Sequence, residues 1–305
     1  MKKLDFHVHV TCPLTAEESA AHFRDMCKRH GYEGVCILAS PHNSLGDHPN
    51  CNELAMAVKA LVPNSYAFGS IHPNGKDYVE QAKELMARGF QGIKLLNGKP
   101  SEYRYYGFGL EDPRFDRFFA YAEEAQIPLD IHNNDPLKNW DVTKATPRAI
   151  ERGWVYDDTL PSQAWFFEVM ENILAKYPRL RLALAHMGFY YTDLSHLTDL
   201  MERYPNLYMD ITPALDIYDE LSKTPAEAER FFRKYHERII YGTDAQNDLT
   251  GFAYDYNNTK DAVVAAYLAG GEPCVIDGHA VTPIHLEPEM LENIYYHNAM
   301  RFMGV

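Results

Sequence analysis

The chain has 305 residues, of which 46% are hydrophobic and 24% are charged, a composition that supports a large core and excludes global disorder. Its 43 acidic residues outnumber the 29 lysines and arginines and give a formal net charge of -14, which repels nucleic acid phosphates and anionic lipid, so neither is an expected partner. No apolar run approaches the roughly 20 residues that span a bilayer, and Asp5, His7 and His9 stand where a signal peptide would be apolar, so no signal peptide is expected.

The five cysteines do not suggest cross-linking. Cys12, Cys27, Cys36, Cys51 and Cys274 are odd in number, scattered, and never spaced as C-x-x-C. A disulfide framework or a cysteine-type zinc site is therefore not expected, and this usage favours the reducing cytoplasm.

Short apolar runs rich in β-forming residues recur along the chain, and each is followed by a stretch in which apolar residues have helical spacing. The runs cover residues 4–10, 34–40, 65–72, 90–97, 127–132, 180–187, 206–212 and 238–244. Strict alternation of strands and helices predicts parallel strands with helices packed outside. Eight such repeats can close on themselves, so the sequence predicts an α/β fold of the (β/α)8 TIM-barrel type. Because no linker, low-complexity tract or charge run suggests a boundary, residues 1–305 are expected to form a single domain.

Two of the predicted helices begin with the spacing of a capping box. Thr15 is followed by Glu18, and Thr224 by Glu227, with Pro225 at the first helical position. We therefore expect both helices to start directly after these threonines.

Two long connections stand out from this regular alternation. The loop after the fifth predicted strand, roughly residues 133–160, contains Arg148 and Arg152, and the pieces 245–259 and 270–287 after the eighth strand look irregular. Loops of this length in a barrel are typical of lids or substrate walls at the C-terminal face.

The first predicted strand carries three polar residues at alternating positions. Residues two apart in a strand share a face, so Asp5, His7 and His9 are expected to point into the barrel. The opposite face, which helices would cover, carries Leu4, Phe6, Val8 and Val10. A barrel interior is normally filled by branched aliphatic side chains, and metal ligation is one reason for inward imidazoles. Asp5 lies one step deeper than His7, so we expect it to support the ligands or anchor the core.

Further polar residues stand at the ends of other predicted strands. His132 ends the fifth strand, His186 the sixth and Asp244 the eighth. The eighth strand is the closing neighbour of the first, which places Asp244 beside His7 and His9. Although two histidines alone could be hydrogen-bonded core residues, four imidazoles and a carboxylate on one rim predict a metal site.

These residues lie in segments that resemble the amidohydrolase superfamily, specifically the amidohydrolase-related branch that includes aminocarboxymuconate-semialdehyde decarboxylase. The matching segments are D-F-H-V-H at 5–9, G-F-Q-G-I-K-L at 89–95, I-P-L-D-I-H at 127–132, L-A-H-M-G at 184–188, Y-P-N-L-Y-M-D at 204–210, I-I-Y-G-T-D at 239–244 and N-I-Y-Y-H-N-A-M-R-F at 293–302. They occur in the right order over essentially the whole chain. As a set they are specific for fold and metal, and they say little about substrate.

The resemblance implies that His7, His9, His132 and Asp244 hold one divalent metal, usually zinc, with manganese as the alternative. Histidine and carboxylate ligands with an open position suit catalytic zinc, which lowers the pKa of bound water to about 7. Asp244 would then take a proton from that water. His186 would lie within reach of the substrate and polarise its carbonyl or stabilise an oxyanion.

Lys94, on the inward face of the fourth predicted strand, has more than one interpretation. In some relatives a carboxylated lysine on this strand bridges two metals, whereas in this branch the resemblance implies an unmodified lysine, one metal and a role for Lys94 in binding substrate. The alternative is a buried ammonium paired with an acidic neighbour such as Asp244 or Asp130.

Other candidates for binding the substrate lie around the predicted mouth of the barrel. His72 ends the third strand, while Lys99 and Arg104 follow the fourth and could bind a substrate carboxylate. A structural hydrogen-bonding role for His72 and simple surface charge for the two cations remain as alternatives. His279 and His285 fall in an irregular stretch and receive no role.

The function that these features predict is metal-dependent hydrolysis of an amide, a lactone or a carboxylated ring-cleavage product. The alternative is a metal-dependent decarboxylase using the same residues, and a third is a catalytically silent binding protein, which the intact set of candidate residues disfavours. A DNA-cleaving relative is disfavoured by the net charge and by the lack of a bridging glutamate. The expected partner is a small-molecule substrate, with a homo-oligomer left open.

Overall fold

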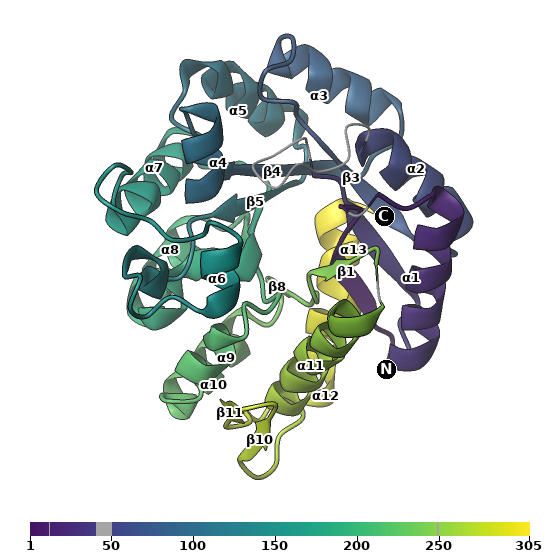
Figure 1. The fold of residues 1–305 in the computed structure, drawn as a ribbon, viewed down its shortest axis with the longest axis vertical. Coiled ribbons are helices and arrows are strands. Elements are labelled where there is room, and N and C mark those ends of the chain that lie inside the picture. Colours follow the sequence, from purple (N-terminus) through teal and green to yellow (C-terminus); the bar gives the residue numbers. More distant parts are fainter. Residues whose placement is uncertain (12, 41–50, 249) are drawn as a thin grey trace.

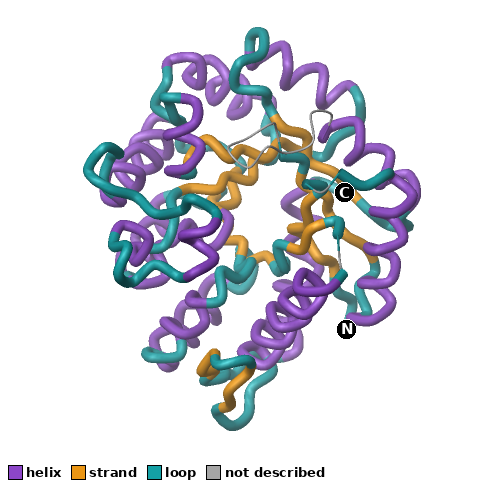
Figure 2. The backbone as a smooth tube through the Cα atoms, viewed as in Figure 1, coloured by secondary structure: helices purple, strands orange, loops and turns teal. Residues whose placement is uncertain are grey.

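The structure, a computed structural model, describes residues 1–11, 13–40, 51–248 and 250–305, and for residues 252–254 it describes the backbone alone. Parallel strands form a curved sheet in the order β8-β7-β6-β5-β4-β3-β2-β1-β9, and the helices surround it (Figures 1 and 2). The predicted (β/α)8 barrel is therefore confirmed, and each of the eight predicted runs contains strand residues.

The strands of the barrel are short and lie within the predicted runs or directly after them. Their bounds are β1 Leu4–His9, β2 Gly34–Leu38, β3 Tyr66–Ser70, β4 Gly92–Gly98, β5 Leu129–Asn133, β6 Leu182–Leu184, β7 Leu207–Asp210, β8 Ile239–Ile240 and β9 Ala245–Gln246.

Helices follow the strands and pack on their outer faces. The α-helices are α1 Ala16–His30, α2 Cys51–Leu61, α3 Tyr78–Ala87, α4 Pro100–Tyr106, α5 Pro113–Ala125, α6 Pro147–Glu151, α7 Gln163–Lys176, α8 Leu194–Arg203, α9 Asp216–Leu221, α10 Pro225–Tyr235, α11 Gly251–Leu268, α12 Pro288–Glu292 and α13 Asn298–Met303. The other helical segments are η1 Leu137–Trp140, η2 Ala185–Thr192 and η3 Asn293–His297.

The eighth predicted strand closes the barrel in two pieces. Its first piece, β8, pairs with β7, and its second piece, β9, pairs with β1. Between them the amide of Phe6 donates to Tyr241 O at 3.1 Å, and the amide of Asp244 donates to His7 O at 2.8 Å. The carboxyl end of this strand therefore lies directly beside the two histidines of β1.

A register shift in β1 overturns part of the predicted alternation. The pairing of β1 with β2 is irregular between Asp5 and Val8, so Asp5 lies opposite Val35 and His9 opposite Leu38. Phe6 packs edge-on against Phe68 and Phe302, inside the barrel, and Asp5 does not share the face of the histidines. A bulge of this kind inserts one residue and reverses the alternation on one side of it.

Asp5 instead joins β1 to the segment that closes the barrel. Its Oδ1 accepts from the amides of His7 and Thr243 at 3.1 and 3.0 Å, and its Oδ2 accepts from the hydroxyl of Thr243 at 2.5 Å. The expectation that Asp5 anchors the core is therefore confirmed, although its direction was predicted wrongly.

The long connections contain more regular structure than the sequence suggested. Helix α11 takes up much of the piece 245–259, whose residue 249 lies outside the described residues, and the predicted irregular stretch is wrong there. The piece 270–287 holds a small antiparallel hairpin of β10 Cys274–Ile276 and β11 His279–Val281. The loop after β5 carries η1 and α6.

The two predicted helix starts differ in their capping. Thr15 and Glu18 form the reciprocal capping box at the start of α1. Thr224 precedes α10, but its side chain makes no capping hydrogen bond, so Pro225 marks this helix start and the predicted box is absent there.

Two further expectations concern cysteines and membranes. Among the described residues, Cys27, Cys36, Cys51 and Cys274 form no disulfide, and Cys12 lies outside the described residues. Within the described part of the chain, no helix is both long enough and apolar enough to cross a bilayer.

Candidate metal centre and substrate cavity

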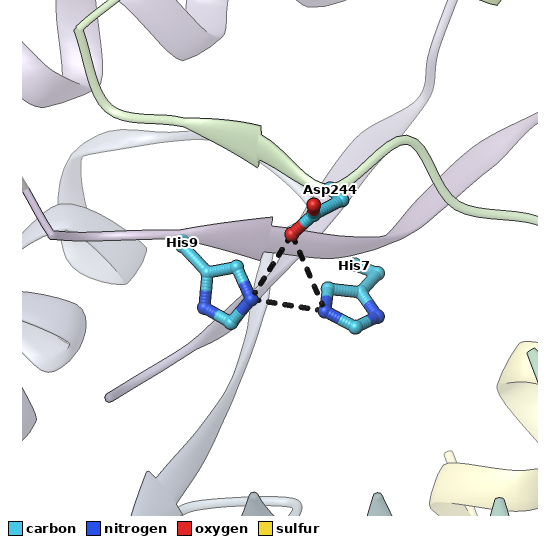
Figure 3. Close-up of side chains that lie close together, drawn as sticks. All are labelled: His7, His9 and Asp244. Atoms are coloured by element: carbon cyan, nitrogen blue, oxygen red, sulfur yellow. Dashed lines mark hydrogen bonds and ion pairs between the residues drawn. The ribbon is translucent and has the colours of Figure 1, made fainter. Parts of the chain in front are cut away.

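Three ligand atoms converge where β1 meets the end of the eighth strand (Figure 3). His7 Nε2 and His9 Nε2 lie 3.0 Å apart. Asp244 Oδ1 lies 3.8 Å from the former and 3.3 Å from the latter. We call His7, His9 and Asp244 the metal cluster.

The two histidines present their Nε2 atoms because Nδ1 is already engaged. His7 Nδ1 lies 2.5 Å from Asp210 Oδ2, and His9 Nδ1 lies 3.0 Å from the carbonyl oxygen of Leu38. An acceptor at Nδ1 favours the tautomer in which Nε2 carries a lone pair. Two lone pairs 3.0 Å apart repel each other, and ligand atoms on one tetrahedral zinc lie about 3.3 Å apart, so the donor set fits a small divalent cation.

The electrostatics of the metal cluster match this use. Burial, together with Lys94 and His9, lowers the pKa of His7 well below its usual value, which keeps the ring neutral. Burial alone would raise the pKa of Asp244, but Lys260 and the two histidines outweigh it and hold that pKa well below the usual value. Neutral imidazoles and an ionised carboxylate are the forms that bind metal.

His132, the fourth expected ligand, lies apart from the metal cluster. It ends β5 beside His186, with ring centroids 4.9 Å apart, and its Nε2 lies 3.4 Å from Asp135 Oδ1. Burial and the nearby Lys99 lower the pKa of His132 to about 4. The structure thus brings three of the four predicted ligands together and places the fourth on the other side of His186.

His186 lies on an unusual turn that directs its ring toward the metal cluster. Strand β6 ends at Leu184, and residues 186–189 all have left-handed backbone, with φ between 53 and 63°. Such backbone costs non-glycine residues about 1–3 kcal/mol and often occurs at functional sites. The ring centroid lies 5.7 Å from that of His7, and Nδ1 lies 3.0 Å from the carbonyl oxygen of Thr212.

This arrangement changes the expected role of His186. With Nδ1–H donated to a carbonyl, Nε2 offers a lone pair, so the neutral ring accepts a hydrogen bond or a proton. Stabilising an oxyanion would need the protonated ring, yet burial and His132 lower the pKa of His186 well below its usual value. The geometry therefore makes Nε2 of His186 a hydrogen-bond acceptor and not an oxyanion donor.

Asp244 is positioned by strain and by close packing. Its backbone is also left-handed, with φ of 56°. Two residues earlier, a Cβ on Gly242 would lie 2.7 Å from the Cβ of His7, so glycine is needed for this close approach. Lys260, from α11, also lies beside Asp244: its ammonium donates to the carbonyl oxygen of Asp244 at 2.9 Å and lies 3.5 Å from Asp244 Oδ2.

A cavity of about 450 Å³ opens at the carboxyl ends of β5 to the eighth strand. Its residues include His132, His186 and Asp244, and the loop after β5 forms one wall. The lining comprises Lys99, His132, Asp135, Pro136, Lys138, Asn139, Thr146, Arg148, Ala149, Trp154, His186, Phe189, Pro213, Ala214, Leu215, Asp216, Asp219, Asp244, Tyr256 and His279. Asp244 therefore belongs both to the metal cluster and to the cavity.

Two residue pairs lie in the wall of the cavity formed by the loop after β5 and the segments opposite it. Lys138 lies 3.4 Å from Asp216, and His279 Nδ1 lies 2.9 Å from Asp219 Oδ2. His279, for which no role was predicted, thus lies in the cavity wall. Because Lys138 belongs to η1 and Asp216 to α9, the first pair joins the loop after β5 to the opposite wall.

The predicted substrate-binding residues have different locations. Lys99 lines the cavity, where its ammonium lies 2.9 Å from Asp135 and 4.3 Å from the centroid of Trp154. Arg104 is exposed and donates to the carbonyl oxygens of residues 153 and 155, which holds the loop after β5 in place. His72 is exposed, and its Nδ1 accepts from the amide of residue 74.

Lys94 and the two arginines of the loop complete this comparison. Lys94 is fully buried and forms an ion pair with Asp130, as one of the interpretations of the sequence expected. Arg148 lines the cavity and lies over the ring of Tyr256 at 4.5 Å. Arg152 lines a smaller adjoining cavity beside Asp244.

Sequence reasoning missed three residues that shape the site. Asp210 ends the segment Y-P-N-L-Y-M-D and orients His7, a role that its position at a strand end could have indicated. Asp135 binds Lys99 and accepts from Tyr156 OH. Lys260 lies on a helix that the sequence did not predict, so no local pattern pointed to it.

Comparisons with known proteins place this architecture among related folds. A family model described as amidohydrolase matches residues 47–305, which excludes His7 and His9. No curated protein matches the chain.

Solved structures match over essentially all of the chain at low identity. An uncharacterised TIM-barrel protein of Bordetella bronchiseptica has 15% identity and a TM-score of 0.64, with 100% of this chain and 99% of that chain covered. A 5-carboxyvanillate decarboxylase of Sphingomonas paucimobilis has 13% identity and a TM-score of 0.60, with the same coverage. A zinc-bound amidohydrolase of Burkholderia multivorans has 11% identity and a TM-score of 0.59, with both chains covered completely. At such identities the likeness shows the fold.

Proposed function

Because the chain belongs to the amidohydrolase family, we propose that it is a metal-dependent enzyme that hydrolyses a C–O or C–N bond in a small, carboxylated substrate. The observation that carries this proposal is the position of Asp244. One carboxylate reaches both the paired Nε2 atoms of His7 and His9 and the cavity in which a substrate would lie.

The metal cluster would hold the ion through His7 Nε2, His9 Nε2 and Asp244 Oδ1, with His132 proposed as the fourth ligand. Zinc is the first choice because the donors are two imidazoles and a carboxylate, and manganese is the alternative. When bound, such an ion polarises a carbonyl and lowers the pKa of a coordinated water.

The residues of the chain itself would divide the remaining work. The anionic Asp244 would orient the attacking water by accepting one of its hydrogen bonds. His186 Nε2, whose lone pair faces the cavity, would take the proton and return it to the leaving group. The loop after β5 would limit access of bulk water, and Arg148 and Lys138 would attract the carboxylate of the substrate.

A decarboxylase is the second candidate, and the apolar part of the cavity favours it. Phe189, Pro213, Ala214 and Leu215 form a wall suited to a flat ring. A dry wall beside a polar centre would assist loss of carbon dioxide from such a ring, and one of the similar structures is a decarboxylase.

Product analysis tests the proposal. Metal-loaded protein would be incubated with lactones, amides and carboxylated ring compounds, and the products identified by mass spectrometry. We expect a product that has gained one water, whereas loss of carbon dioxide would establish the second candidate. Full activity after chelation of the metal would overturn both.

Two variants test the division of roles. Asn tolerates left-handed backbone well, so Asp244→Asn and His186→Asn should keep the fold at these strained positions. Each should lose at least about 100-fold in turnover. His186→Asn should retain metal, and an empty site in this variant would show that His186 is a ligand.

A further inference from the structure

The small hairpin outside the barrel contributes a histidine to the cavity wall. Its strands β10 and β11 pair with Ile276 opposite His279, and Asp277 and Gly278 form the turn between them. Both turn residues have left-handed backbone, with φ of 47 and 86°. Asp-Gly with positive φ at both positions is typical of the tight turn that fixes the register of a hairpin. The place of His279 at the start of β11 is therefore determined by its immediate neighbours in sequence.

Hydrogen bonds to two helices hold this hairpin in place. Asp277, in the turn, accepts from the hydroxyl of Thr259 on α11. Asp219, on α9, accepts from the amide of Ala280 at 3.1 Å. The hairpin therefore lies between α9 and α11 (Figure 1). Because an isolated two-stranded hairpin is only marginally stable in water, these contacts are needed to fix its orientation.

One face of β11 is directed into the protein. His279 and Val281 are two residues apart and share this face, since side chains alternate along a strand. Val281 is buried, whereas Ala280 between them is exposed. The ring of His279 lines the cavity of about 450 Å³, and Asp219 lines it as well. The hairpin thus presents the imidazole of His279 to the place where a substrate would lie.

Asp219 also determines which nitrogen of His279 is available to a ligand. Its Oδ2 lies 2.9 Å from His279 Nδ1. A carboxylate at Nδ1 requires the proton to be there, so the neutral ring carries its lone pair at Nε2. In the described part of the chain, no residue donates a hydrogen bond to His279 Nε2. The ring therefore offers the cavity a hydrogen-bond acceptor.

We infer that His279 Nε2 is a specificity-determining acceptor that binds a hydroxyl group of the substrate, and that Asp219 positions it. This inference rests on the proposed function, because it takes the cavity to be the place where the substrate lies. The metal cluster and His186 would act on the reacting bond. His279 belongs to the hairpin and not to the barrel, so it would recognise another part of the same molecule. A site built to accept from a hydroxyl disfavours an analogue that lacks the donor.

Binding of paired ring compounds tests this inference. The probes are meta- and para-hydroxybenzoate, each compared with the methoxybenzoate of the same substitution, which keeps the oxygen but lacks the donor. Calorimetry would give Kd at about pH 8, where imidazole is ordinarily neutral, for metal-loaded wild type, His279→Phe, Asp219→Asn and His285→Phe. His285→Phe is the matched control, since it changes an exposed histidine of the same stretch that does not line the cavity.

We expect one hydroxybenzoate to bind the wild type and His285→Phe roughly 3–10-fold more tightly than its methoxy partner, the range for one hydrogen bond. In His279→Phe the two should bind with nearly equal affinity. Asp219→Asn gives a more specific result. Its side-chain carbonyl can still accept from the amide of Ala280, but its amide donates to His279 Nδ1, which moves the proton of the ring to Nε2. The methoxy compound should then gain affinity, and the preference should disappear.

Each other outcome contradicts the inference. A preference that persists in His279→Phe or Asp219→Asn would overturn it, as would the lack of any preference in the wild type. Equal losses for both compounds in His279→Phe would show that this residue only shapes the wall. If His279→Phe does not fold, as judged by circular dichroism, His279→Leu would replace it.

The two proposals fail in different ways. A wild type that hydrolyses a lactone or an amide but binds neither hydroxybenzoate would refute the role of His279 alone. A metal-loaded wild type that neither binds these rings nor turns over any lactone, amide or carboxylated ring would refute the proposed function as well.

Discussion

At the scale of single residues, the hydrogen bond at Nδ1 of each histidine decides whether Nε2 presents a lone pair. His7, His9 and His186 each have an acceptor at Nδ1, and these acceptors come from Asp210 and from the carbonyls of Leu38 and Thr212. Sequence spacing could place the rings on one rim, but it could not show which nitrogen faces inward. That information depends on neighbouring strands, which meet only in the folded barrel.

Asp210 allows a direct test of this orientation. Burial and Asp130 raise the pKa of Asp210, so its charge depends on nearby cations such as Lys94. Asp210→Asn should weaken metal affinity by about 10–100-fold without unfolding the protein, because it replaces the carboxyl group that orients His7 with an amide. Competition with a coloured chelator would measure this affinity.

The control is Asp216→Asn, which changes an acidic residue of the cavity wall that lies outside the metal cluster. Its metal affinity should stay close to that of the wild type. Equal losses in both variants would mean that overall negative charge, and not the orientation of His7, sets the affinity.

At the scale of elements, the sequence predicted strands better than it predicted their irregularities. Apolar runs located β1 to β8, because both faces of such strands are buried, whereas β9 lies in a stretch that was expected to be irregular. The register shift in β1 escaped prediction since it depends on pairing with β2. Helix α11 escaped because its first turns, from Gly251 to Asn258, are rich in aromatic and asparagine residues and lack a regular apolar face.

Tertiary contacts instead hold α11 against the barrel. Asp261 accepts from the hydroxyls of Tyr32 and Tyr241, each at 2.5 Å, and from His30 Nδ1 at 2.8 Å. The adjacent Lys260 points to Asp244. Docking of α11 thus also sets the position of the Lys260 ammonium beside the metal cluster.

Asp261→Asn should therefore destabilise the protein. Burial would raise the pKa of Asp261, but the bonds from His30, Tyr241 and Tyr32 outweigh it and lower the pKa to about 2. A carboxyl with a depressed pKa stabilises the folded state above its unfolded pKa, and this contribution is lost as the pH falls through the folded value. The variant should lose about 2 kcal/mol, constant down to about pH 5 and shrinking only below about pH 4.

Urea unfolding at several pH values would measure this difference. Asp255→Asn, which changes an exposed residue of the same helix, should leave the free energy of unfolding nearly unchanged. A loss that varied between neutral pH and pH 5 would mean that another group controls the docking of α11.

At the scale of the whole molecule, closure of the barrel is what assembles the site. The sequence predicted that closure and the meeting of His7, His9 and Asp244, because parallel strands place their carboxyl ends on one rim. It did not predict that His132 would turn to Asp135, or that Arg104 would hold a loop, because these contacts depend on the path of the connection after β5. The net charge of -14 likewise did not indicate that Lys99 and Lys138 of the cavity form ion pairs.

The closing contact between Asp5 and Thr243 links the stability of the barrel to its metal affinity. Thr243→Val removes a hydroxyl donor from the buried Asp5, and losing such a partner costs about 1–3 kcal/mol. Since burial already raises the pKa of Asp5 to about 7, the wild type loses stability as the pH rises toward that value. Without the hydroxyl the pKa of Asp5 should rise further, so the loss of unfolding free energy in Thr243→Val should be largest above about pH 7.

The amide of Asp244 donates to His7 O across the same junction between β1 and the end of the eighth strand. Thr243→Val should therefore lower both the free energy of unfolding and the metal affinity, whereas Asp210→Asn should lower metal affinity alone. Thr243→Ser keeps the hydroxyl and should stay near the wild type in both measurements. If Thr243→Val unfolded more easily yet bound metal as tightly as the wild type, the contact between Asp5 and Thr243 would stabilise the barrel without positioning His7 and Asp244.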